Sequence, residues 1–172
     1  MDTETILRVA GRALPAGTCH GVAETLRPEG RGEVRRTLDG RAVLLGFGLA
    51  TRLEVRLSGT GVRPPALCDL RTGDAVTVDC ASVRSATLPP ATDAYALPHD
   101  AVPGSVRVAT VDGERDQTAY AFERTVYVQA SPAVREVRWR PRLACLVTEP
   151  LSVDTDEPGA RASWSLSLVE AG

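Results

Sequence analysis

The stretch "VRWRPRLACLV", residues 137–147, alternates apolar and polar side chains along its whole length. Successive side chains of a strand point to opposite sides of a sheet, so this alternation predicts a β-strand with one buried and one solvated face. Pro141 interrupts the pattern of hydrogen-bond donors, because proline has no backbone N–H. We therefore expect this strand to lie at a sheet edge or to bulge at Pro141.

The same period of two recurs along the chain. It is found in "RLEVRLSG" (52–59), "DAVTVDCASV" (74–83), "SVRVATV" (105–111), "TVYVQ" (125–129) and "SWSLSLV" (163–169), and no window of eleven or more residues has a helical period. Asp-Gly pairs at 39–40 and 112–113 stand between apolar runs and predict hairpin turns. The sequence therefore predicts an all-β fold, an antiparallel β-sandwich or barrel.

Length and composition favour a single β domain spanning residues 1–172. The chain has 172 residues and 43% hydrophobic residues, which suffices for a sizeable core without disulfides or a metal. Two segments, at about 15–33 and 87–104, lack the strand pattern and are rich in Gly and Glu or in Pro. We expect them to be two long loop insertions that extend from the domain as arms.

Charge and cysteine usage exclude several classes of function. The basic residues are all Arg and are scattered along the strands, and the net charge is −2, so we expect no nucleic-acid partner. A signal peptide and membrane insertion are not expected, because the N-terminus begins acidic and no run of about 18 apolar residues exists. The four cysteines follow no zinc spacing, so we expect reduced core thiols and no metal or cofactor.

No catalytic constellation is visible, and we expect that the protein is not an enzyme. Nucleophilic catalysis needs a base beside the nucleophile, and the chain has two histidines, His20 and His99. His20 follows Cys19 directly, and neighbours on an extended chain point to opposite faces. His99 lies in the Pro-rich segment, and the chain has no G-x-S-x-G motif.

The segment "SVDTDEPGAR", residues 152–161, gathers Asp154 and Asp156 near a glycine. Its D-x-D opening is similar to that of a calcium-binding loop, but Pro158 fills the fifth position and Ser165 the twelfth, where a bidentate Glu is needed. We therefore expect a turn between the last two strands, whose carboxylates contact Arg side chains of the same or a neighbouring subunit. A hydrolase that uses a carboxylate pair is the least favoured hypothesis.

Aromatic residues are few and make up 4% of the chain. Trp139 and Trp164 fall on the apolar faces of their strands, which predicts core positions. Tyr95, in the long Pro-rich segment, is the better candidate for an exposed contact. A carbohydrate-binding β-sandwich module that uses Tyr95 to contact a cell-surface glycan is therefore an alternative function.

Three segments together resemble a family of tail-tip or baseplate structural proteins of tailed bacteriophages and prophages. They are, in order, "GVAETLRPEGRGEVRRTLDGRAVLL" (21–45), "SGTGVRPPALCDLRTGDAVTVDC" (58–80) and "WRPRLACLVTEPLSVDTDEPGARASWSLSLVE" (139–170), about half of the chain. The family pattern has Gln at Glu24, Asn at Asp39 and often an aromatic residue at Pro158. The resemblance implies a structural component of the phage tail rather than a catalyst.

The resemblance and the residue patterns together lead to one expected function. We expect a virion protein, made in the host cytoplasm, that forms a homo-oligomeric ring (trimer or hexamer) and links the tail tube or hub to neighbouring tip proteins. A repeated heterologous contact closes such a ring. The residues expected at subunit contacts come from the two arms and the acidic turn: Arg27, Pro89, Pro90, Tyr95, His99, Asp154 and Asp156.

Overall fold

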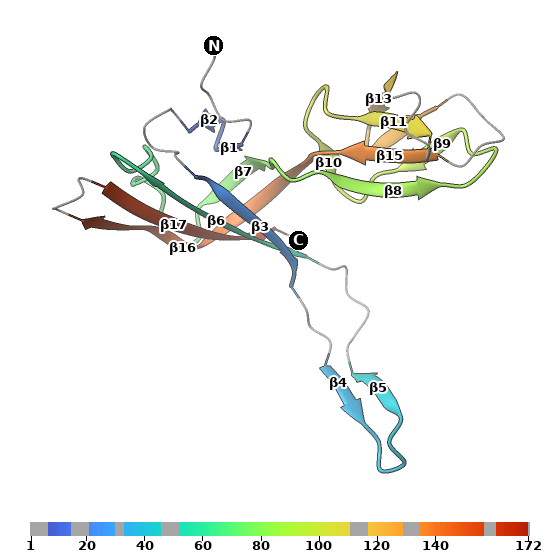
Figure 1. Ribbon diagram of the computed structural model, residues 1–172, viewed down its shortest axis with the longest axis horizontal. Helices are drawn as coiled ribbons and strands as arrows, with labels where there is room; N and C mark the ends of the chain where they lie inside the picture. The colour runs from blue at the N-terminus through green and yellow to red at the C-terminus, as the bar shows by residue number, and fades with distance from the viewer. Residues whose placement is uncertain are drawn as a thin grey trace.

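The computed structural model confirms the all-β prediction. It describes residues 7–14, 21–29, 33–45, 52–110, 117–128, 135–156 and 161–171, and these residues contain antiparallel strands and no helix. The strands form an eight-stranded sheet, a four-stranded sheet, a three-stranded sheet and a separate two-stranded hairpin (Figure 1).

The eight-stranded sheet, here called the large sheet, has the order β2-β1-β7-β16-β17-β6-β3, with β10 pairing to β16. Its strands are β1 (Arg8–Val9), β2 (Arg12–Ala13), β3 (Ala23–Pro28), β6 (Leu53–Gly61), β7 (Ala75–Asp79), β10 (Asp100–Ala101), β16 (Pro141–Asp156) and β17 (Arg161–Glu170).

The apolar side chains on one face of the large sheet form its core. In β6 and β17 every second side chain is buried, and Leu166 and Leu168 lie opposite Leu57 and Val55. These residues share a core cluster with Trp164, Cys80, Cys145 and the loop residues Leu67 and Leu70. The opposite face carries Ser, Thr and Arg side chains, as the alternation predicts.

A second core lies between the two smaller sheets, here together called the small sandwich. The four-stranded sheet has the order β12-β11-β15-β8 and the three-stranded sheet β13-β14-β9. The strands are β8 (Arg84–Leu88), β9 (Ala94–Ala96), β11 (Arg107–Thr110), β12 (Gln117–Thr118), β13 (Tyr120–Phe122), β14 (Thr125–Tyr127) and β15 (Arg135–Trp139). Trp139 and Val126 come from different sheets and share this core, so the two sheets pack face to face.

The stretch 137–147 forms two strands instead of one. β15 ends at Trp139 in the small sandwich, and β16 begins at Pro141 in the large sheet. Pro141 is therefore the first residue of its strand, a position that proline can occupy without loss of a needed N–H donor. The proline is accommodated by this position, and not by the edge position or bulge that the sequence predicts. The predicted burial of Trp139 and Trp164 is confirmed, since each is 3% exposed.

The two-stranded hairpin projects from the rest of the molecule and is here called the arm (Figure 1). It consists of β4 (Glu33–Arg36) and β5 (Ala42–Leu45), which pair with each other in a separate sheet. The Asp39-Gly40 hairpin is confirmed, with φ +82° at Gly40. The second predicted hairpin, at 112–113, lies outside the described residues.

Both predicted loop insertions contain strands, so this part of the prediction is wrong. Within 15–33, Ala23–Pro28 forms β3 at the edge of the large sheet, paired with β6. Within 87–104, Ala94–Ala96 and Asp100–Ala101 form β9 and β10. In the second segment the prolines stand between the short strands, whereas in the first Pro28 is the last residue of β3.

Candidate functional site

The acidic end of β16 is the first candidate. Asp154 and Asp156 lie on the strand itself, opposite Ser163 and Arg161 of β17. The expectation that they belong to a turn is therefore wrong, because the β16–β17 pairing extends to Asp156. A shallow hollow of about 200 Å³ lies here, lined by Thr60, Asp154, Thr155, Asp156, Arg161, Ala162 and Ser163.

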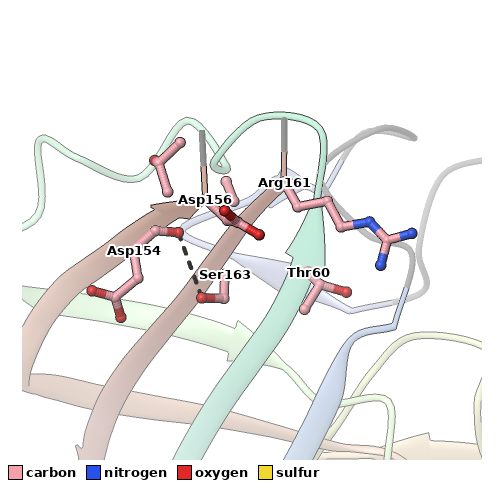
Figure 2. Close-up of a pocket in the computed structure, with 7 residues that line it drawn as sticks. Thr60, Asp154, Asp156, Arg161 and Ser163 are labelled. Carbon is pink, nitrogen blue, oxygen red and sulfur yellow. Dashed lines mark hydrogen bonds between the residues drawn. The ribbon is translucent and has the colours of Figure 1, made fainter. Parts of the chain in front are cut away.

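The polar side chains that line this hollow do not converge on one point. Figure 2 shows the carboxylates of Asp154 and Asp156 pointing in different directions, and both residues are exposed. The Ser163 hydroxyl donates a hydrogen bond at 3.5 Å to the backbone carbonyl of Asp154, and not to its carboxylate. Among the described residues, no group of three or more His, Cys, Asp and Glu side chains is arranged to hold a metal ion.

Beyond Val147, one edge of β16 is open. β7 pairs with β16 from Arg142 to Leu146, and Asp74 and Gly73 continue the backbone hydrogen bonds as far as Val147. From Thr148 to Asp156, no described strand pairs with this edge. The register of the β16–β17 pairing shifts on both sides of Glu149, and the Glu149 carboxylate accepts a hydrogen bond from the Ser167 hydroxyl at 2.8 Å.

His99 lies at the junction between the small sandwich and the large sheet. Its Nδ1 is 2.9 Å from Oε1 of Glu170 on β17, and the two side chains are 16% and 19% exposed. The other carboxylate oxygen of Glu170 accepts a hydrogen bond from the backbone N–H of Leu53 at 3.0 Å. Leu53 is the first residue of β6. The Glu170 carboxylate therefore connects His99 and the last strand with the start of β6, the strand that follows the arm.

Pro89, Pro90 and Tyr95 do not form a common exposed surface. Both prolines are exposed just after β8. Tyr95 lies on β9 opposite Val126, packs against the second core and has its ring centroid 6.3 Å from that of Trp139. The prediction that Tyr95 is an exposed contact is therefore wrong, because the alternation of β9 turns it inward.

Two other aromatic side chains are exposed on the three-stranded sheet. Phe122 on β13 and Tyr127 on β14 are 53% and 59% exposed. The register places them on the outer face, since Ala121 and Val126 are paired and pack inward. The alternation of "YAF" and "TVY" is the signal that could have identified them in the sequence.

The hairpin turn beside these aromatics has an unusual backbone. Glu123 and Arg124 have φ of 45° and 65°, a conformation that residues other than Gly and Asn seldom adopt. Arg124 is held there by Asp100, whose carboxylate lies 2.6 Å from its Nε, and its own carbonyl accepts from the N–H of Leu97. Asp100 raises the pKa of Arg124 through this hydrogen bond.

The arm is the most exposed part of the described chain. Residues 35–43 are all exposed, including the tip residue Leu38. The tip is stabilised internally, because the N–H of Thr37 donates to the Arg41 carbonyl at 2.9 Å and Arg36 Nη1 donates to the Gly40 carbonyl at 3.1 Å. The Thr37 hydroxyl also donates to Asp39 and lowers the pKa of that carboxyl.

Arg27 lies at the base of the arm and not beside the acidic end of β16. It is exposed on β3, with Glu54 of β6 opposite. His99 and Glu170 lie toward this end of the large sheet, whereas Asp154 and Asp156 lie at the far end of the β16–β17 hairpin. The structure therefore separates the predicted contact residues into distinct regions.

No protein-family model matches this chain, and no curated protein matches it significantly. The described residues form no helix that is long and apolar enough to cross a membrane.

Proposed function

We propose that this chain is a structural subunit of the tail tip or baseplate of a tailed bacteriophage, where it links the tail tube or hub to neighbouring tip proteins. The resemblance of three segments, which occur in the same order as in that family, supports the proposal. In this role the protein is a virion component of the tail, made in the host cytoplasm, and has no catalytic activity.

The arm is the observation that carries the proposal. A two-stranded hairpin is at best marginally stable by itself in water, and needs a third strand or a packed face. β4 and β5 pair with each other in a sheet of their own, and their tip residue Leu38 is fully exposed. A hairpin held out in this way gains stability when it contacts another subunit, which is what a ring or hub component needs.

The oligomeric state tests the proposal. We expect native mass spectrometry of the purified chain to give a homo-oligomer, a trimer or a hexamer. We also expect no retention on glycan arrays. A protein that stays monomeric at high concentration would contradict the ring.

The exposed pair Phe122 and Tyr127 favours a second candidate function, a carbohydrate-binding β-sandwich module. Exposed aromatic rings on a sheet can stack on the apolar faces of sugars. In that case the monomeric protein would bind glycans, and Phe122→Ala with Tyr127→Ala would abolish the binding. Binding that survives this double substitution would exclude the aromatic pair as the site.

A further inference from the structure

The arm and the free edge of β16 are complementary in charge and in backbone hydrogen bonding. The arm, residues 33–45, carries Arg35, Arg36 and Arg41 against Glu33 and Asp39, a net charge of +1, so the other residues of a chain of net charge −2 carry −3. The free edge of β16, residues 148–156, carries Glu149, Asp154 and Asp156 and no basic residue. One surface is basic and the other acidic.

Both surfaces also present unpaired strand edges. Each strand of the arm has one edge that no described strand covers, and no described strand covers the edge of β16 opposite β17 from Thr148 to Asp156. An extended segment can add to such an edge through main-chain hydrogen bonds, while side-chain charges select the partner. Pro150 lacks a donor, so pairing is favoured over Ser152–Asp156, all of which is exposed.

The two surfaces lie apart in one molecule. In Figure 1 the arm projects from the end of the large sheet where β3 ends and β6 begins, and the β16–β17 hairpin points in another direction. An arm that pairs with an acidic edge of this kind would therefore pair with that of a second copy of the chain.

We propose that the arm of one copy pairs with β16 of a second copy, along Ser152–Asp156, and that arginine side chains of the arm contact Asp154 and Asp156 there. The arm would then continue the large sheet of its neighbour, and the hairpin would gain the third strand that it needs. The contact joins two different surfaces, so its repetition builds a ring. This inference rests on the proposed function, since it names the contact through which the subunits assemble.

Charge reversal tests the contact on the full chain. Variant A carries Arg36→Glu and Arg41→Glu, and variant B carries Asp154→Arg and Asp156→Arg. Each variant alone places like charges on both surfaces, so we expect self-association to weaken by about tenfold or more, measured by analytical ultracentrifugation. Variant C carries all four substitutions and again has opposite charges on the two surfaces, at every contact of a ring of any size, so we expect it to assemble.

Variant C also controls for folding, because a misfolded variant would not assemble. A matched control, Arg107→Glu with Arg138→Glu, reverses two exposed charges of the four-stranded sheet and should assemble as the unmodified chain does. High salt should weaken the association of the unmodified chain.

The outcomes separate this inference from the proposed function. If the unmodified chain is an oligomer and variants A and B keep its mass, the arm contact is wrong and the ring remains. The same conclusion follows if A and B dissociate and variant C does not assemble. If the unmodified chain is a monomer, the ring itself fails.

Discussion

The β6–β17 pair and the arm are both antiparallel pairs of strands, but they are held in different ways. In β6 and β17, alternate residues such as Leu57 and Leu166 are buried at 1% exposure each, on a face covered by other elements. In the arm, residues 35–43 are all exposed, and Val43, which would occupy an apolar face, is 40% exposed. The two regions have the same antiparallel strand pairing but differ in how far their apolar side chains are buried.

This difference shows which part of the chain is self-sufficient. Burial of apolar area is the main favourable term in folding, so the large sheet is stable through its own core. The arm buries little within the subunit and depends on turn hydrogen bonds and on whatever it contacts. The large sheet therefore determines the stability of the subunit, and the arm is available for assembly.

The largest expected effect is the loss of Trp164 from the core. Trp164→Ala should lower the free energy of unfolding by about 3–5 kcal/mol, because it removes a large buried side chain and leaves a cavity. Urea unfolding followed by circular dichroism measures this change. Val43→Ala in the arm is the counterpart, and should change the free energy by less than about 0.5 kcal/mol. Equal effects would remove the distinction between the two regions.

Gly59 tests how closely β6 packs beneath the indole ring. A Cβ atom at Gly59 would lie 2.7 Å from Cζ2 of Trp164, so the ring must move. We expect Gly59→Ala to cost about 1–3 kcal/mol of unfolding free energy through overpacking. Combined with Trp164→Ala, the substitution should cost much less, because the clash is gone. A full cost in the double variant would show that Gly59 is needed for another reason.

Glu170 tests the connection between the large sheet and the base of the arm. Glu170→Ala leaves the Leu53 N–H and His99 without their acceptor, and should cost about 1–2 kcal/mol of unfolding free energy. Glu170→Gln keeps an oxygen for Leu53 and should cost less. Thermal unfolding of both variants gives the comparison, and equal losses would argue against the Leu53 hydrogen bond.

The smallest expected effect concerns thiol reactivity. Burial raises the pKa of Cys145 to about 12, and raises that of Cys80 as well, whereas Cys68 is exposed. The thiolate is the reactive form, so a raised pKa leaves little of it at pH 8. We expect iodoacetamide to label Cys68 in the folded protein and to reach Cys80 and Cys145 after unfolding in urea. Rapid labelling of Cys145 in the folded state would show that the core opens readily.

The sequence predicts the strands far better than their arrangement. Alternation identifies β6, β7 and β17 and places Trp139 and Trp164 in the core, because a period of two is a local property. The change of sheet at Arg140 cannot be read from alternation, which runs through it without a break. The sequence pattern likewise places Tyr95 in a loop, because β9 has only three residues and its inward face is set by its pairing with β14, more than twenty residues away.

The contact regions could be predicted only in part. Asp39-Gly40 identifies the tip of the arm, but nothing local shows that its strands lack a third partner. Asp154 and Asp156 are visible as acidic residues, whereas the open edge of β16 depends on where β7 ends. Whether a strand edge is covered is a property of the assembled sheet.

Removal of the arm tests the central claim most directly. The N–H of Glu29 donates to the Arg52 carbonyl at 2.6 Å, so an Asn-Gly turn can join these two residues and close the β3–β6 hairpin without the arm. We predict that native mass spectrometry shows a monomer for this variant and an oligomer for the unmodified chain. We also predict that the two proteins unfold at the same urea concentration. An armless chain that keeps the oligomeric mass of the unmodified protein would contradict the account.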